Sequence, residues 1–209
     1  MNFLAHIYLS GPNPRVTVGN FIGDFVKGRN LVQQFDEEVA FGIELHRAID
    51  FYTDHHTIVK ESKGLLWSTY RHYSAVLVDV FYDHFLSRYW DKYSAVPLDQ
   101  YATDTYASLK SFELILPADV KQLLPYMIRQ NWLVNYGNFD GLQQTLNGMS
   151  RRTRHDSKME RSIVDLRQHY DLLKRNFEDF FPDLIQHCNT LLAAANKNLI
   201  IYPNFTSHA

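Results

Sequence analysis

Acidic side chains and histidines lie inside strongly apolar helical segments of this chain. Around Asp79 the sequence reads AVLVDVFYDHFL over residues 75–86. A second segment of this kind, FGIELHRAIDFYTD, covers residues 41–54. A buried carboxylate costs several kcal/mol unless it is paired, protonated or bound to a metal. The fold must therefore bring partners for these groups into its interior.

The apolar pattern is helical nearly throughout, and the period-2 alternation of β-strands is scarce. We predict an all-α protein with a single-domain multi-helix bundle over residues 1–199 and a frayed tail at 200–209. We expect Asp36 to cap one helix and Pro182 to separate the last two. The expected helices cover about residues 15–27, 36–62, 68–93, 98–114, 118–136, 139–149, 162–180 and 183–198.

The composition limits which binding partners and which cellular compartment we expect for this protein. The 209 residues carry a net charge of −2, which argues against nucleic acid as a partner. No apolar run approaches the ~18 residues that span a membrane, and the N-terminal segment lacks the basic region of a signal peptide. Cys188 is the single cysteine, which excludes an intrachain disulfide and a cysteine-based zinc site. We expect a cytoplasmic protein without a membrane or nucleic-acid partner.

His46, Asp50 and Asp54 are four residues apart and share one face of the helix expected over residues 36–62. That helix is also apolar on another side, so its polar row should face neighbouring helices. Taken singly, the residues allow simpler interpretations. His46 could be a core histidine, Asp50 a partner of Arg47, and Asp54 a solvated surface residue.

Asp79 and Asp83 lie on one ridge of the helix expected over residues 68–93. His84 is roughly 100° around the same helix. Asp79 could equally pair with an arginine, Arg71 or Arg88.

Two further candidates lie near the N-terminus. Asp24 shares a ridge with Asn20 on the first expected helix, and His6 lies just upstream. Hard divalent cations take carboxylate oxygens and imidazole nitrogens as ligands. A cation held there would lower the pKa of a water molecule and screen the charge of a phosphoryl oxygen. The residues that could supply such a site are Asp24, His46, Asp50 and Asp83.

The segment after residue 150 is basic in an otherwise slightly acidic protein. Its candidate docking residues are Arg151, Arg152, Arg154 and Lys158. This segment is either a solvated connection between helices or a docking surface for an acidic protein or phosphate groups.

Several motifs together resemble the acyl carrier protein phosphodiesterase family, a divergent relative of the all-α His-Asp metal-dependent phosphohydrolases. They occur in the family's order from residue 1 to about residue 180. One departure from the wider superfamily is that His46 and Asp50 are one turn apart, where the superfamily has an adjacent His-Asp pair. The motifs are MNFLAH (1–6), GNFIGDFV (19–26), GIELHRAID (42–50), TD (53–54), DVFYDHFL (79–86) and LNGM (146–149).

The resemblance implies a metal-dependent phosphodiesterase that removes 4′-phosphopantetheine from holo acyl carrier protein. It implies Mn²⁺ as the cofactor, with Mg²⁺ or Fe²⁺ as alternatives, and the carrier protein as the partner that the basic segment docks. Asp24 or Asp83 would orient the attacking water, and His84 would protonate the leaving serine oxygen. The metal ligands would be Asp24, His46, Asp50 and Asp83, with His6, Asp79 and Asp54 as further candidates.

Two other functions stay open at this point. One is hydrolysis of a nucleotide or another small phosphorylated molecule at the same metal site. The other is a non-catalytic helical binding module, in which the acids and histidines are structural polar pairs.

Overall fold

The computed structural model describes residues 1–153 and 155–195. These residues form eleven α-helices and five short 3-10 helices, with no β-strand among them, which confirms the predicted all-α class. The α-helices are α1 Phe3–Tyr8, α2 Pro14–Ile22, α3 Glu37–His55, α4 Thr57–Tyr70, α5 Tyr73–Arg88, α6 Leu98–Ser111, α7 Ala118–Arg129, α8 Trp132–Asn135, α9 Phe139–Arg152, α10 Ile163–Gln168 and α11 Tyr170–Ala194.

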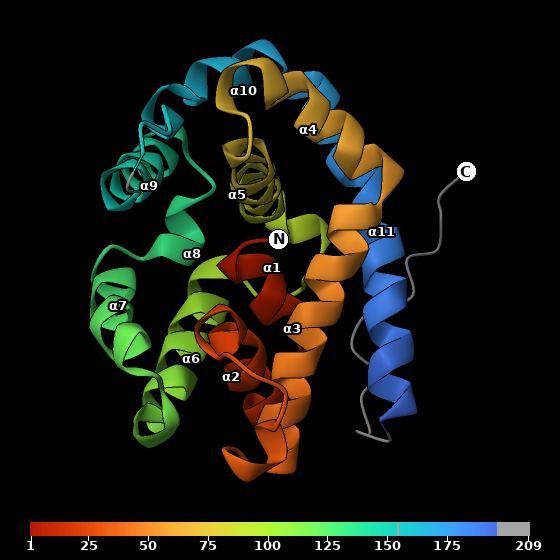
Figure 1. Ribbon diagram of the computed structural model, residues 1–209, viewed down its shortest axis with the longest axis vertical. Helices are drawn as coiled ribbons and strands as arrows, with labels where there is room; N and C mark the ends of the chain where they lie inside the picture. Colours follow the sequence, from red (N-terminus) through yellow and green to blue (C-terminus); the bar gives the residue numbers. More distant parts are fainter. Residues whose placement is uncertain (154, 196–209) are drawn as a thin grey trace.

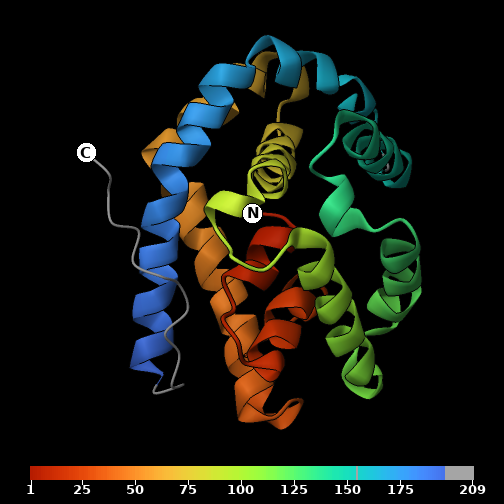
Figure 2. The same ribbon diagram turned by 180° about the vertical axis from the view of Figure 1, so that it is seen from behind.

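The helices surround a central N-terminal segment. Figure 1 shows α3, α4 and α11 on one side and α7, α8 and α9 on the other, with α1 and the N-terminus between them. The opposite view shows α11 running along the outside of the bundle (Figure 2). Residues at the start of the chain are therefore placed to meet side chains from α3 and α5.

Two glycines allow α2 and α3 to pack with their backbones nearly in contact. A Cβ atom on Gly42 would lie 2.2 Å from the carbonyl oxygen of Val16. A Cβ atom on Gly19 would lie 2.2 Å from the carbonyl oxygen of Val39. Real Cβ atoms do not approach backbone oxygens so closely, so glycine is required at both positions. This close packing fixes the position of α2 relative to α3.

The core is built around α5 and α11. Most of α5 is buried, including its polar residues Asp83 and His84. It packs against α11, which contributes Phe177, Phe180 and Phe181, all fully buried. A helix buried on nearly all sides has no solvent face, so its polar groups need partners inside the protein.

Several expected helices are interrupted where a residue leaves the helical conformation. The helix expected over residues 36–62 ends at His55, because His56 is extended and α4 begins after it. Arg71, with a φ of 50°, ends α4 before α5 begins. Asn131, with a φ of 42°, separates α7 from α8. Asp36 caps α3 as predicted, since its carboxylate accepts from the N–H groups of residues 38 and 39.

The predicted break at Pro182 is wrong. Helix α11 runs without interruption from Tyr170 to Ala194, with Pro182 inside it. A proline removes one helical hydrogen bond, but the apolar side chains on both sides of it are buried in the core. Tertiary packing here outweighs the local preference of proline against a helix interior.

The predicted tail at 200–209 and the domain boundary at 199 lie outside the described residues. None of the described helices is long and apolar enough to cross a membrane.

Candidate metal centre

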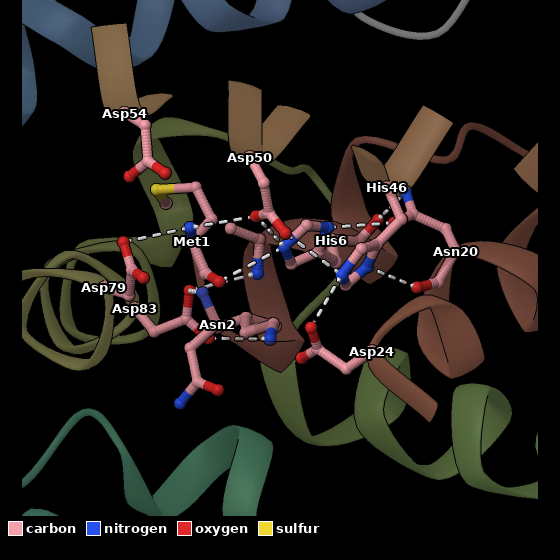
Figure 3. Close-up of polar contacts among 12 residues, drawn as sticks. Met1, Asn2, His6, Asn20, Asp24, His46, Asp50, Asp54, Asp79 and Asp83 are labelled. Carbon is pink, nitrogen blue, oxygen red and sulfur yellow. Dashed lines mark hydrogen bonds and ion pairs between the residues drawn. The ribbon is translucent and has the colours of Figure 1, made fainter. Parts of the chain in front are cut away.

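Helix α3 presents His46 and Asp50 on one face, as their spacing predicts. Nε2 of His46 lies 3.2 Å from Oδ2 of Asp50 and 3.2 Å from Oδ1 of Asp24. Asp24 reaches this point from the short 3-10 helix Gly23–Phe25 that follows α2. The structure thus brings together three of the four predicted metal ligands (Figure 3).

His6 completes the cluster. Its Nε2 lies 3.2 Å from Oδ1 of Asp50, so Asp50 contacts both histidines through different oxygens. The rings of His6 and His46 stack with their centroids 4.0 Å apart. One ligand atom from each of His6, His46 and Asp50 lies within 4.8 Å of the other two. The sequence placed His6 only among the further candidates, and the structure places it at the centre.

Asn20 holds both histidines in orientation. Nδ1 of His46 lies 2.8 Å from the backbone carbonyl oxygen of Asn20, to which it donates. The side-chain Nδ2 of Asn20 donates to the carbonyl oxygen of His6 and to Ser10. This leaves Oδ1 of Asn20 as the acceptor for Nδ1 of His6, at 2.9 Å. With both Nδ1 atoms occupied as donors, both Nε2 atoms face Asp50. Metal-binding histidines are oriented in this way.

The charges of the cluster are strongly coupled. Burial opposes a proton on His46, but the hydrogen bonds that its Nε2 donates to Asp24 and Asp50 outweigh this effect and raise the pKa of His46 to about 9. Burial and, to a smaller extent, the neighbouring His46 together lower the pKa of His6 to about 4. Burial opposes ionisation of Asp50, but the hydrogen bond that it accepts from His46 and the nearby amino group of Met1 hold its pKa well below the usual range. Protonated His46 therefore sets one positive charge against the two carboxylates of Asp24 and Asp50, and a divalent cation bound to neutral histidines would supply two.

The chemistry of the donor set fits a divalent metal. Two imidazole Nε2 atoms, the partly exposed carboxylate of Asp50 and the exposed carboxylate of Asp24 match the mixed nitrogen and oxygen ligands of divalent metal sites.

Asp83 is occupied elsewhere. Its carboxylate accepts hydrogen bonds from the backbone N–H groups of Asn2, Leu4 and Ala5, at 3.3, 2.7 and 3.2 Å. Burial nevertheless raises the pKa of Asp83 to about 7. It therefore anchors the first turn of α1, the helix that carries His6. The structure does not bring Asp83 into the ligand cluster, although the sequence placed it there.

His84 lies among aromatic side chains. Its Nδ1 lies 2.7 Å from the carbonyl oxygen of Tyr136, to which it donates, and its ring stacks on Phe139. Its Nε2 lies 3.4 Å from the hydroxyl of Tyr170. Burial lowers the pKa of His84 to about 4, which leaves it neutral at pH 7.

The remaining acids line a cleft of about 780 Å³ above the cluster. Oδ1 of Asp79 lies 3.0 Å from the amino group of Met1, which is itself 3.7 Å from Asp50. Asp54 pairs with Lys63 at 2.6 Å. The cleft's far wall comes from α7, α8 and α9. A polar cluster at one side of a large cleft is the usual arrangement of an active site.

The predicted docking residues differ in position. Arg152 lines the cleft, Arg151 lies beside it in an adjoining hollow, and Lys158 is exposed in the following loop. Arg154 lies outside the described residues.

Comparison with known proteins identifies the family. The family model described as "Acyl carrier protein phosphodiesterase" matches residues 1–184. The chain belongs to the acyl carrier protein phosphodiesterase family. The predicted family and enzyme class, a hydrolase of phosphodiester bonds, are thereby confirmed. No solved structure shows significant similarity to the chain.

Curated relatives from two genera carry the family's name. An acyl carrier protein phosphodiesterase of Photorhabdus laumondii is 32% identical over 206 residues, which cover 97% of this chain and all of the relative. Those of Escherichia coli strains O139:H28 and K12 are each 36% identical over 187 residues, covering 88% of this chain and 96% of the relative. The range matched by the family model, residues 1–184, contains the positions of all the cluster residues.

Gly23→Ala should impair the phosphodiesterase while leaving it folded. A Cβ atom at position 23 would lie 2.3 Å from Cγ of His46, so the imidazole must move. Displacement of a catalytic group by about 1 Å can cost roughly a hundredfold in rate. We expect a loss of that order with an unchanged far-ultraviolet circular dichroism spectrum. Gly64→Ala is the matched control, because nothing lies within 4 Å of its Cβ position. Full activity of Gly23→Ala would contradict the placement of His46 at the active centre.

His84 should make stability depend on pH. Its folded pKa of about 4 is below the ordinary value of 6.5, so its contribution is complete above pH 6.5 and is lost as pH falls toward 4. We expect the difference in unfolding free energy between wild type and His84→Gln to shrink over this range, by at most about 3 kcal/mol. Urea denaturation at closely spaced pH values measures it. A constant difference would show that His84 titrates normally.

Proposed function

We propose that this protein uses a divalent cation to hydrolyse the phosphodiester between 4′-phosphopantetheine and a serine of acyl carrier protein, which converts the holo carrier to the apo form. The observation that carries this proposal is the convergence of His6, His46 and Asp50 beside a large cleft. The family of the chain supports the choice of substrate, since its curated relatives are named for this activity.

The proposed ligands are His6, His46 and Asp50, with Asp24 beside them. This set differs from the sequence prediction in that His6 takes the place of Asp83. Mn²⁺ is the proposed ion because it accepts imidazole nitrogen and carboxylate oxygen equally well, and Mg²⁺ and Fe²⁺ are alternatives. When bound, the ion supplies an activated nucleophile and neutralises charge on the phosphoryl oxygens.

Asp24 is suited to the proton transfer. Its side chain is 69% exposed and lines the cleft, whereas Asp50 is held between two histidines. The hydrogen bond with His46 lowers the pKa of Asp24, so it is ionised and can accept a proton from water at pH 7. Asp79 and Asp54 stand farther along the wall, and their carboxylates contact Met1 and Lys63 rather than the histidines.

The basic residues outside the cleft are the proposed docking site for the acidic carrier. Arg151 and Lys158 are both exposed, and neither forms a salt bridge within the part of the chain that the structure describes. We place the reaction in the cytoplasm, with neither nucleic acid nor membrane as partner.

The direct test is mass spectrometry of holo acyl carrier protein incubated with the protein and Mn²⁺. We expect loss of the phosphopantetheine mass, none of it in the presence of a chelator, and none with Asp50→Asn. Mn²⁺ should also raise the melting temperature of the wild type but not of Asp50→Asn. The exposed residue Asp91 offers a control, Asp91→Asn, which should behave as the wild type.

Two results would overturn this proposal. Turnover of nucleotides with an unchanged carrier mass would establish a small-molecule phosphohydrolase. No metal-induced stabilisation and no turnover, with the protein folded, would support a non-catalytic binding module.

Charge reversal should separate docking from chemistry. In the double variant Arg151→Glu and Lys158→Glu we expect KM for holo carrier to rise about tenfold or more, because like charges now meet the acidic carrier. Turnover of bis(p-nitrophenyl) phosphate, a small diester, should not change. Lys60→Glu with Arg175→Glu changes the net charge equally at other exposed sites and serves as the control. Equal losses on both substrates would contradict a docking role.

A further inference from the structure

A second hollow adjoins the cleft on its far side. It has a volume of about 470 Å³ and shares Leu123, Tyr126, Trp132, Thr145 and Arg152 with the cleft. Because both cavities use the same wall residues, they lie next to each other, and together they extend from the acids past Trp132 to α9; we refer to the pair as the groove.

The chemical character of the groove changes along its length. At the cluster it is lined by carboxylates, and at its middle by the aromatic rings of Tyr126 and Trp132. The outer hollow has no carboxylate, and carries the amides Gln130, Gln144 and Asn147 together with Arg151. With a divalent cation bound among these carboxylates, the lining suits a ligand that has an anionic phosphodiester at one end and a neutral, amide-bearing chain beyond it.

Trp132 is held in place at the junction. Its indole Nε1 donates to Oε1 of Gln130 at 2.8 Å, and the guanidinium carbon of Arg152 lies 5.9 Å from its ring centroid. The side chain of Tyr126 on α7 is 53% exposed to solvent. Two aromatic rings, one fixed and one exposed, on the wall of a groove form a surface for an apolar chain.

We propose that this groove binds the pantetheine arm of the substrate. The phosphodiester lies at the His6, His46 and Asp50 cluster, the methyl and methylene groups of the arm cross Trp132 and Tyr126, and its amides meet the amide side chains of the outer hollow. Arg152 belongs to this groove and offers donors to the arm's carbonyl groups, while Arg151 and Lys158 remain for the carrier protein. The inference rests on the proposed function.

The test compares three substrates that share the reacting phosphodiester. They are holo carrier, the p-nitrophenyl ester of 4′-phosphopantetheine, and bis(p-nitrophenyl) phosphate, which lacks the arm. In Trp132→Ala and in Tyr126→Ala we expect KM to rise about tenfold for the two arm-bearing substrates. The rate on the armless diester should stay within twofold of the wild type. Trp67→Ala removes an exposed tryptophan of α4 outside the groove and should change none of the three.

A binding measurement tests the same site without turnover. Pantetheine, which has no phosphate, should bind the wild type in calorimetry and bind at least tenfold more weakly to Tyr126→Ala. Tyr126 is exposed, so this variant keeps the fold even if Trp132→Ala does not.

Each alternative outcome has a distinct meaning. Loss on the holo carrier alone would show that the hollow docks the carrier protein and would overturn the inference. Equal loss on all three substrates would place Trp132 in the catalytic centre instead. A wild type that cleaves the holo carrier, with unchanged variants, would refute the groove and leave the proposed function standing. A wild type that never cleaves the holo carrier would refute both.

Discussion

The site depends on one buried residue, Asn20, whose backbone bonds His46 and whose side chain bonds His6. Its carbonyl oxygen accepts from His46 and its side-chain oxygen accepts from His6. These two bonds fix the stacked rings and direct both Nε2 atoms at Asp50. Without them each imidazole could rotate to place either nitrogen toward the carboxylate, and the ligand geometry would be lost.

The backbone makes this arrangement possible by close packing. Gly19 and Gly42 let α2 approach α3, and Gly23 leaves room for the imidazole of His46 above it. A carboxylate that caps α1, that of Asp83, holds the first turn of the helix carrying His6. Residues that contact no ligand atom thus set the distances within the cluster. A small change at Gly23, where the nearest atoms belong to the side chain of His46, should act on chemistry before it acts on folding.

The sequence predicted the parts of the site that depend on helical period. His46 and Asp50 are one turn apart on α3, so their shared face follows from spacing alone. Helical spacing could not predict which groups would be the partners of each carboxylate. Asp50 meets histidines and Asp83 meets backbone N–H groups, although both stand in apolar helical sequence. His6 stands in α1, which has six residues and is too short to show a helical period in the sequence. For the fold, the helix class was predictable, while the break at His56 and the continuity through Pro182 depend on tertiary packing.

The division of the chain explains how one site can serve a large substrate. The cluster comes from the first 50 residues, held by α1, α2 and α3, whereas the opposite wall comes from residues 119–152. The first part needs rigidity, and glycine contacts and buried hydrogen bonds supply it. The second part carries exposed aromatic, amide and basic side chains, which suit contact with a partner. The two parts are in contact where Asn2 donates to the hydroxyl of Tyr136 and where the ring of Phe3 packs against Trp132. Exposed residues of the far wall beyond these contacts, such as Arg151, can set which substrate binds without disturbing the ligands that act on the phosphodiester.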